Sequence, residues 1–377
     1  MFGVLEKENL LLKECLLAKR LGKKIFIYGA SLSAKMVLNV LKRHGIPLEG
    51  FCVDAQFYKK GMYKEGLPIM LVDKLVVESN RGEDIAIIVA FTVEKKLDFR
   101  RYGHIQIIDR DFWLFGTAYN YIGNEIDFDF WEKNRDRFET LYDALEDEKS
   151  KACMLAYINQ KISGDFRYLE SLYGSNQYYE KELVDIGNVR CMVDCGTYDG
   201  DSFRRFCQNY EKVVGRQYNE TAVLLEPSKE AYDKLKSLNI ADKKKLIIEN
   251  YGVWESEGCL YFSEDGTSSR IEKRGTDMAR VNKLDNIAYE IFRENNFKAG
   301  EGFIKMDIEG SELNALRGGS NLVQKYHPIL AVCVYHKKED LITIPAYIKS
   351  LYEEYRFFLR IYSRYAKELV LYAIPNT

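Results

Sequence analysis

The chain has 377 residues, of which 46% are hydrophobic and 30% are charged, a balance typical of folded globular proteins that excludes a wholly disordered chain. Its 55 Lys and Arg residues against 57 Asp and Glu residues give a formal net charge of -2. This charge argues against a dedicated nucleic-acid-binding protein, because such domains usually carry a basic excess. At about 100–200 residues per domain, the length predicts two or three domains.

The N-terminal segment and the cysteines indicate where the protein works. Charged residues interrupt the leucines of the first 24 positions, so we find no apolar core of a secretion signal there and expect an amphipathic helix over residues 5–20. No stretch approaches the ~20 apolar residues that cross a bilayer. The eight cysteines include no CxxC pair and the four histidines do not cluster with them. We therefore expect reduced thiols, no zinc site, no membrane span and a cytoplasmic protein.

Residues 24–112 alternate short apolar strands with helical segments. We expect a helix at residues 34–43 and strands at residues 24–28, 48–54, 85–90 and 104–109. Nearly continuous apolar strands separated by helices are typical of a parallel sheet covered on both faces. The sequence therefore predicts a small Rossmann-like α/β domain over residues 1–112.

The first turn of this domain resembles a degenerate dinucleotide-binding turn. Gly29 follows the first strand, but Ser31 and Ala34 stand where a full fingerprint would have further glycines. Asp54 ends the second strand, about where such folds place an acid that binds ribose. Three interpretations stay open: a domain that holds a nucleotide-linked sugar acceptor, an NAD-type site, or a structural domain without ligand.

Residues 113–188 differ from the preceding part because Tyr, Phe, Asp and Glu dominate and long apolar strands are absent. We predict helices at residues 131–146 and 153–161. The acidic residues between 125 and 148 are interpreted as a solvated helix surface rather than as a surface for a basic partner. This part is predicted to form a helical bridge that packs on the next domain.

A second α/β domain is predicted over residues 189–377. Its expected strands are at residues 191–195, 223–226, 246–248, 303–307 and 329–335, followed by a hairpin of residues 357–362 and 368–374. Ser228 is a candidate N-cap for one of the intervening helices. Five strands separated by helices and closed by a hairpin predict a mostly parallel sheet with one antiparallel edge strand.

Acidic residues and glycines lie where two of these strands end. Gly196 permits a close backbone approach to a ligand, and Gly200 permits close entry into the next helix. Asp194 and Asp199 would repel a diphosphate but suit a ligand that carries an ammonium or a sulfonium. Glu226 ends the neighbouring strand, where an acid accepts hydrogen bonds from ribose hydroxyls. Together these residues favour a ribose-bearing cofactor over isolated caps and solvated turns.

A charged row follows at residues 305–309. Strand alternation places Lys305 and Asp307 on one face, with Glu309 beyond them. A charged row beside apolar residues is costly unless it is paired or functional, so an internal pair of Lys305 with Glu309 is the structural alternative. His336 follows the strand at residues 329–335, and it could transfer a proton or act as a structural hydrogen-bonding residue.

Eight short segments resemble one known family in their order and spacing, over about residues 185–375. They are residues 193–202 (VDCGTYDGDS), 226–227 (EP), 284–287 (LDNI), 305–312 (KMDIEGSE), 327–328 (HP), 335–337 (YHK), 344–345 (IP) and 371–373 (LYA). The family is that of the FkbM-type methyltransferases, which use S-adenosyl-L-methionine (SAM) and act mostly on oxygen. Cys195 departs from the family pattern, in which Val or Ile is frequent, and this changes packing more than chemistry.

The resemblance implies a class I methyltransferase sheet and a set of roles. Asp194, Gly196 and Gly200 would line the methionine end of SAM, and Glu226 would bind its ribose. Asp199 is also expected to bind the cofactor. The adenine would lie beside three residues after the third strand: Gly252, Val253 and Trp254. The transfer site would contain Asp307 and Glu309, with Asp307 or His336 as the base. Neighbouring carboxylates could also hold a divalent metal, which the sequence leaves undecided.

These features predict SAM-dependent O-methylation of a sugar or another small polar hydroxyl acceptor, such as a nucleotide-linked sugar or a glycan. The alternative is an NAD-dependent oxidoreductase or a nucleotide-sugar-binding protein that uses the N-terminal domain. It is disfavoured because Gly29 lacks partner glycines. A non-enzymatic scaffold is a third interpretation. We expect the acceptor pocket to be built from residues 113–188 and from loops at residues 263–283, where residues 268–270 are taken as an exposed loop. A homo-oligomer is left open.

Overall fold

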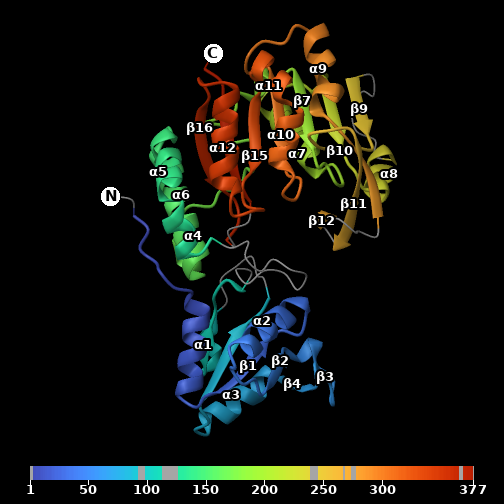
Figure 1. The fold of residues 1–377 in the computed structure, drawn as a ribbon. Coiled ribbons are helices and arrows are strands. Elements are labelled where there is room, and N and C mark those ends of the chain that lie inside the picture. The colour runs from blue at the N-terminus through green and yellow to red at the C-terminus, as the bar shows by residue number, and fades with distance from the viewer. Residues whose placement is uncertain are drawn as a thin grey trace. The chain divides into compact units, whose positions relative to one another are not determined.

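The computed structural model describes residues 3–91, 98–112, 126–237, 245–265, 268–272, 277–364 and 368–376. The chain divides into two compact units, whose elements are drawn in Figure 1. Unit 1 contains Met1–Arg135, Leu155–Ser171 and Arg364–Ala366. Unit 2 contains Asp136–Met154, Leu172–Ser363 and Lys367–Thr377. The mixed α/β class expected from the sequence is confirmed, while the predicted boundaries at residues 112 and 188 stay a prediction.

Unit 1 contains a six-stranded sheet in the order β3-β4-β2-β1-β5-β6, which is parallel except for the β3–β4 pair. Its strands are β1 (Lys24–Tyr28), β2 (Gly50–Val53), β3 (Tyr63–Lys64), β4 (Leu67–Leu71), β5 (Ile85–Val89) and β6 (Gln106–Ile108). The sequence did not indicate β3 and β4, because Pro68 interrupts a short run. Pro68 is tolerated because β4 pairs with β2 only from Ile69 onward.

Side-chain alternation explains how this sheet is covered on both faces. Ile25 and Ile27 of β1 pack into one core cluster with helices α1 (Leu10–Arg20) and α2 (Leu32–Arg43). Phe26 and Tyr28 point to the other face, in a cluster with helix α3 (Val72–Asn80). Successive residues of a strand face opposite sides, so a continuous apolar strand is buried by helices on both.

Three helices follow: α4 (Phe128–Lys133), α5 (Arg135–Ala144) and α6 (Glu148–Ser163). They account for the helices predicted at residues 131–146 and 153–161. Helix α6 is shared, because its residues up to Met154 belong to unit 2 and those from Leu155 belong to unit 1. Residues 113–125 of the predicted bridge lie outside the described residues.

Unit 2 contains a seven-stranded sheet in the order β16-β17-β15-β14-β7-β8-β9. Its strands are β7 (Cys191–Cys195), β8 (Thr221–Leu225), β9 (Leu246–Glu249), β14 (Gly302–Met306), β15 (Ile329–Cys333), β16 (Arg356–Ile361) and β17 (Leu369–Ile374). Of these seven strands, β17 alone runs opposite to the others, and it pairs antiparallel with both β16 and β15. The expected antiparallel strand therefore exists, but it lies second from the edge. Only a few residues separate β16 from β17 in the sequence, so β17 pairs directly with β16. In the sheet, β17 lies between β16 and β15.

Helices cover both faces of this sheet (Figure 1). On one face, aromatic residues of α7 (Asp201–Val214), such as Phe203 and Phe206, pack against Phe303 of β14. On the other face, Gly302 of β14 lies so close to Phe292 of α9 (Leu284–Glu294) that a Cβ atom would meet its ring at 2.4 Å. Unit 2 also contains the helices α8 (Lys229–Ser237), α10 (Glu312–Gly318), α11 (Ser320–Tyr326) and α12 (Asp340–Leu351).

Unit 2 also has a small four-stranded sheet in the order β10-β13-β11-β12. Its strands are β10 (Gly252–Val253), β11 (Gly258–Asp265), β12 (Ser268–Glu272) and β13 (Asp277–Asn282). The prediction of loops at residues 263–283, with an exposed loop at residues 268–270, is therefore wrong for the described part of this segment. The pairing of β11 with both β12 and β13 makes these segments strands, and nothing in the local sequence shows this pairing.

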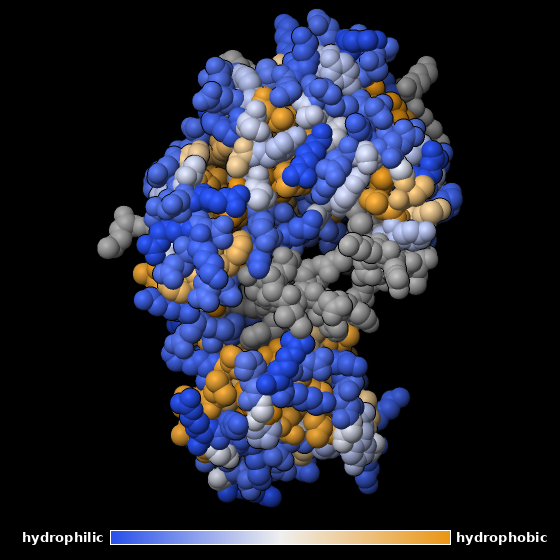
Figure 2. Space-filling model, viewed as in Figure 1, coloured by the Kyte–Doolittle hydropathy of each residue, from blue (hydrophilic) through white to orange (hydrophobic). Residues whose placement is uncertain are grey.

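The described residues contain no helix that is both long enough and apolar enough to cross a membrane. On the face shown in Figure 2, hydrophilic residues predominate, and hydrophobic ones are most numerous over unit 1.

Candidate active site

A pocket of about 260 Å³ lies in unit 2, beyond the carboxyl ends of β7, β8 and β14. Open α/β sheets bind their ligands at this edge. Of the residues predicted to bind a cofactor or to act in catalysis, six line the pocket. They are Gly196, Glu226, Gly252, Val253, Asp307 and Glu309. The other five, Asp194, Asp199, Gly200, Trp254 and His336, do not line it.

The turn after β7 touches the end of β14, and this contact requires glycine. Gly196 has a φ of 78°, and an added Cβ atom would lie 2.2 Å from the carbonyl oxygen of Asp307. Any side chain would therefore push the two strand ends apart. Gly200 has a φ of 82° and is the N-cap of α7, which matches its predicted role in entering the helix.

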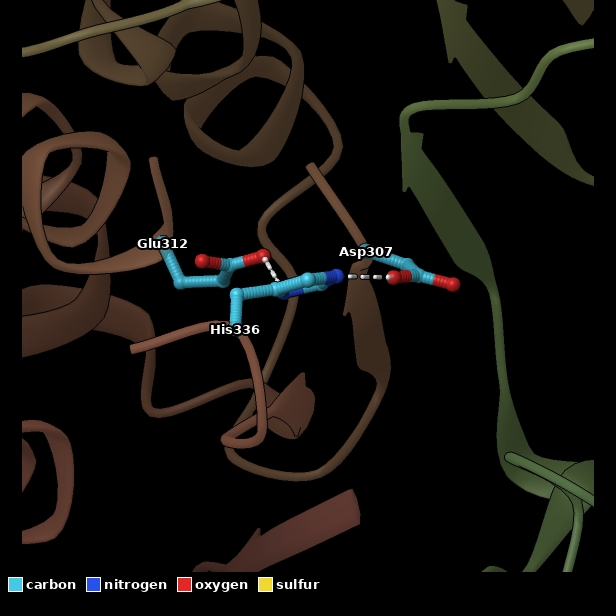
Figure 3. A group of neighbouring side chains, drawn as sticks. All are labelled: Asp307, Glu312 and His336. Carbon is cyan, nitrogen blue, oxygen red and sulfur yellow. Dashed lines mark ion pairs between the residues drawn. The ribbon is translucent and has the colours of Figure 1, made fainter. Parts of the chain in front are cut away.

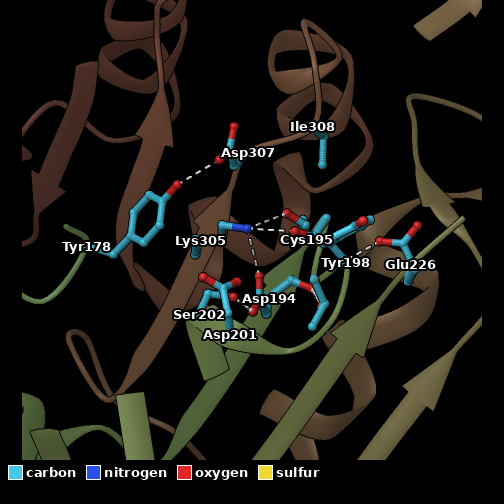
Figure 4. Close-up of polar contacts among 12 residues, drawn as sticks. Tyr178, Asp194, Cys195, Tyr198, Asp201, Ser202, Glu226, Lys305, Asp307 and Ile308 are labelled. Carbon is cyan, nitrogen blue, oxygen red and sulfur yellow. Dashed lines mark hydrogen bonds and ion pairs between the residues drawn. The ribbon is translucent and has the colours of Figure 1, made fainter. Parts of the chain in front are cut away.

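Asp194 lies beneath the pocket and not in its wall. Its side chain is fully buried and forms an ion pair with Lys305, with Nζ 3.1 Å from Oδ1. The Ser202 hydroxyl donates to its other oxygen, and Lys305 also donates to the Gly196 carbonyl oxygen at 2.7 Å (Figure 4). Lys305 thus forms its ion pair with Asp194, and the alternative pairing with Glu309 is wrong. Although burial alone would lower it, the charges of Asp194 and Asp307 raise the pKa of Lys305, which stays protonated.

Glu226 follows β8 and is only 6% exposed, yet its carboxylate reaches the pocket. Its two oxygens accept hydrogen bonds from the backbone N–H groups of Tyr198 and Ser228, both at 2.8 Å. Burial raises the pKa of this carboxyl group. These bonds fix the carboxylate at the strand end and leave it further acceptor capacity.

Asp199 and Trp254 are two further predicted cofactor residues that do not line the pocket. Asp199 lies in the turn before α7 and contacts the start of that helix: it accepts a hydrogen bond from the Asp201 N–H at 3.1 Å and lies 3.5 Å from Arg204. Asp201 lines the pocket in its place. The carbonyl oxygen of Trp254 packs against Gly318 of α10, where an added Cβ atom would be 2.1 Å away.

Asp307 follows β14, and its side chain is 23% exposed. Tyr178 donates its hydroxyl to Oδ2 at 2.8 Å, and Tyr335 donates to Oδ1 at 3.3 Å. Burial alone would raise the pKa of Asp307, but the charges of Lys305 and His336 and the bond from Tyr178 hold it below its usual range. The carboxylate is therefore ionised and held in place by donors on both oxygens.

His336 lies behind Asp307, with 7% of its side chain exposed (Figure 3). Its Nδ1 atom is 2.9 Å from Glu312 Oε1, and its Nε2 atom is 3.5 Å from Asp307 Oδ1 and 3.7 Å from Glu309 Oε2. Burial alone would lower the pKa of His336, but the carboxylates of Glu312, Glu309 and Asp307 raise it to about 10. An imidazolium cannot accept a proton, so this charge state favours Asp307 over His336 as the base.

Among the described residues, Asp307, Glu312 and His336 offer ligand atoms that all lie within 4.8 Å of one another. Figure 3 shows the imidazole between the two carboxylates, which contact different nitrogens of the ring. Ligands of a single ion converge on one point, whereas these groups form a row of alternating charge. The arrangement therefore fits a charge-paired row better than a metal site.

Several pocket residues were missed by sequence reasoning. Tyr178 precedes β7, and Glu368 precedes β17 and accepts a hydrogen bond from Gln177. Neither has a spacing signal, because only the folded chain brings these segments to the end of β14. Glu312 could have been singled out, since it lies in the charged segment of residues 305–312.

In unit 1, the structure brings Gly29 and Asp54 to the ends of the paired strands β1 and β2. Gly29 has a φ of 114°. Asp54 accepts a hydrogen bond from the Tyr28 hydroxyl at 2.7 Å and another from Arg101 at 3.0 Å. The carboxylate predicted to bind ribose is thus already held by two side chains, and ligand binding there stays a prediction.

Two comparisons with known proteins found matches to this chain. Residues 194–364 match the family model described as the methyltransferase FkbM domain, which confirms the resemblance for this part of the chain and supports a methyltransferase function. The crystal structure of methyltransferase FkbM from Methylobacillus flagellatus KT is similar to the chain, with a TM-score of 0.74 and 22% identity. The match covers 98% of this chain and 94% of that one and shows a shared fold.

A second solved structure is much less similar. Human N-acetylserotonin methyltransferase in complex with SAM has a TM-score of 0.27 and 8% identity, over 65% of this chain and 60% of that one. A likeness of this size carries no argument about function. No curated protein matches the chain by sequence.

Proposed function

Because residues 194–364 match the FkbM methyltransferase family, we propose that unit 2 binds SAM in its pocket and methylates a hydroxyl group of a small polar acceptor such as a sugar. The observation that carries this proposal is the meeting of Gly196, Glu226 and Asp307 around one pocket at the carboxyl edge of the sheet. These residues come from the ends of three neighbouring strands, β7, β8 and β14.

The residues present fit the parts of SAM. Glu226 offers an acidic acceptor for the ribose hydroxyls, which is the role that acids at this position of nucleotide-binding sheets perform. Gly252 and Val253 of β10 form an uncharged wall suited to the adenine. The turn after β7 lines the pocket through Gly196 and Thr197, beside which the methionine part would lie.

Bound SAM would supply a methyl group carried on a sulfonium. The chain's own task is to align the acceptor and to take its proton. Asp307 is ionised, lines the pocket and is oriented by Tyr178 and Tyr335. It would accept a hydrogen bond from the acceptor hydroxyl and take that proton as the new O–C bond forms and the S–C bond breaks, with the electron pair left on sulfur.

The cofactor part of the proposal is tested by calorimetric titration of Glu226→Gln with SAM. Loss of one charge-assisted hydrogen bond costs about 1.5–3 kcal/mol, so we expect roughly 10–150-fold weaker binding. Glu255→Gln is the matched control, because Glu255 has a side chain 41% exposed and pairs with Arg317 outside the pocket. Equal affinity of both variants would place SAM elsewhere.

The chemical part is tested by Asp307→Asn. The amide keeps the shape of the carboxylate but cannot take a proton, so we expect SAM binding to be retained and methyl transfer to be lost. S-adenosylhomocysteine formation with a panel of free glycans and nucleotide-linked sugars measures the transfer. Full activity of the variant on an acceptor used by the wild type would exclude Asp307 as the base.

A further inference from the structure

We propose that Glu312 and His336 form a positioning pair that holds the carboxylate of Asp307 at the pocket wall, and that His336 serves as a fixed cation instead of a base. The inference rests on the proposed methyl transfer for the reaction that Asp307 serves. The pair itself is defined by contacts within unit 2 and can be examined without any substrate.

The pair is built from three elements that meet at one point. Glu312 is the first residue of α10, His336 follows β15, and Asp307 follows β14. The Glu312 side chain is fully buried, and its Oε1 atom accepts a hydrogen bond from the backbone N–H of Ile308 at 2.9 Å and lies 2.9 Å from His336 Nδ1. Figure 3 shows the ring between the two carboxylates. Glu312 therefore fixes the ring, and the ring presents Nε2 to Asp307.

The charges around His336 require a cation in this position. Four carboxyl groups besides Glu312 act on it from the surrounding elements: Asp307, Glu309, Asp340 and Glu368. The nearby cation Lys337 donates to the Gly310 carbonyl oxygen. A neutral imidazole would leave the fully buried Glu312 without a compensating charge, and an uncompensated buried charge is strongly destabilising. The high pKa of His336 agrees with this account.

A charged imidazolium donates from both nitrogens and has no lone pair left. His336 can therefore orient Asp307 and keep it ionised, but it cannot take a proton from an acceptor. Because His336 is buried behind Asp307 and does not line the pocket, an acceptor would meet Asp307 first. His336 and Glu312 are thus positioning residues.

The decisive experiment is a pH titration of the full-length protein labelled with ¹³C at histidine Cε1 and observed by NMR. The chain has four histidines, so a His336→Gln variant assigns the signal of His336. We expect this signal to keep the imidazolium position from pH 5.5 to 9, while an exposed histidine titrates near the ordinary value of about 6.5. A wild-type His336 signal that titrates near pH 6.5 would overturn the proposal.

A second variant, Glu312→Gln, tests whether Glu312 sets the charge of the His336 ring. The amide oxygen can still accept a hydrogen bond from the Ile308 N–H, but the negative charge beside the ring is lost. We therefore expect the His336 signal of this variant to titrate between pH 5.5 and 9. An unchanged signal in this variant would show that Glu312 does not set the charge of the ring. Once an acceptor is known, the kcat of Glu312→Gln should be more than tenfold below that of the wild type, while its SAM dissociation constant stays within about twofold of the wild-type value.

These outcomes separate the two proposals. If SAM does not bind but His336 stays an imidazolium, the function is wrong and the pair stands as a structural feature without the positioning role. If SAM binds and His336 titrates normally, only the positioning pair is wrong.

Discussion

At the scale of single residues, the site depends on a buried ion pair beneath the pocket. Lys305 and Asp194 have side chains only 4% and 0% exposed, and Lys305 also ties the turn after β7 to β14 through the Gly196 carbonyl oxygen. The charge of each residue is tolerated only because the other compensates it. The pair therefore holds in place the turn that we expect to contact the cofactor.

Replacing Lys305 with Met should be severely destabilising. Breaking a buried pair leaves an uncompensated charge and costs about 3–5 kcal/mol, measured as the free energy of unfolding in urea. The double variant Lys305→Met with Asp194→Asn should recover part of the loss, because no lone charge remains. A single variant as stable as the wild type would contradict the ion pair.

A second residue-scale prediction concerns Gly196. Gly196→Ala should destabilise the protein by more than the roughly 1–2 kcal/mol that a left-handed conformation costs a non-glycine residue, because its Cβ atom would lie 2.2 Å from Asp307. Gly215→Ala is the control: Gly215 has a φ of 77°, but nothing lies within 4 Å of an added Cβ atom. Urea unfolding compares the two variants, and equal losses would rule out the close contact.

Residue-scale sequence reasoning found glycines and acids at strand ends, because strand ends and turns leave local signals. It placed Gly196, Glu226 and Asp307 in one site, and the structure gathers them around one pocket. It could not find Tyr178 or Glu368, since nothing in the local sequence shows that their segments return to the end of β14. Sequence reasoning also could not show that Asp194 is buried in an ion pair with Lys305.

At the scale of elements, helix α12 begins in an acidic environment. Asp340, its first residue, is 4% exposed and accepts a hydrogen bond from the Lys337 N–H at 2.9 Å. Burial, reinforced by the charge of Glu312, raises the pKa of Asp340 to about 7. The start of α12 therefore binds a proton more tightly in the folded protein than in the unfolded chain.

This shift makes stability depend on pH in a defined direction. A carboxyl group with a raised folded pKa contributes its full stability below its unfolded value of about 3.9, and this contribution is lost as the pH rises toward 7. In Asp340→Asn, whose side chain cannot ionise, the free energy of unfolding should decline less between pH 4 and pH 7 than in the wild type. Urea unfolding at each pH measures the difference, and parallel curves would refute the assignment.

Helices and strands were predicted correctly where the pattern of apolar residues is strong. The prediction failed where a segment becomes a strand only by pairing with a distant segment. The central strands of both sheets were predicted because each is a short apolar run buried on both faces. The strands β12 and β13 and the end of β11 were taken for loops, because the backbone pairing of β11 with both partners is not visible in the local sequence. The sequence predicted that β16 and β17 form a hairpin. It did not predict that β17 lies between β16 and β15, with β16 at the edge of the sheet.

At the scale of the whole molecule, one pocket and one polar cluster lie in different units. The pocket lined by Glu226 belongs to unit 2, and the cluster of Tyr28, Asp54 and Arg101 belongs to unit 1. The solved FkbM structure matches the fold over nearly the whole chain, so unit 1 is part of that architecture. We expect the SAM site to work through residues of unit 2 alone.

Asp54→Asn tests this division. A ligand that binds only the folded state raises the melting temperature, and we expect SAM to raise it equally in the wild type and in Asp54→Asn. The variant loses the charge that pairs with Arg101, and Asp54 is not among the residues that line the pocket of unit 2. A SAM-induced shift that disappears in Asp54→Asn would move the cofactor site to unit 1.

The central claim is tested most directly by calorimetric titration of the full-length protein with SAM, then with S-adenosylhomocysteine and then with NAD. The account predicts saturable binding of the first two, with a dissociation constant on the order of micromolar, near −8 kcal/mol, and no binding of NAD. Binding of NAD without binding of SAM or S-adenosylhomocysteine would contradict it and move the active centre to Gly29 and Asp54.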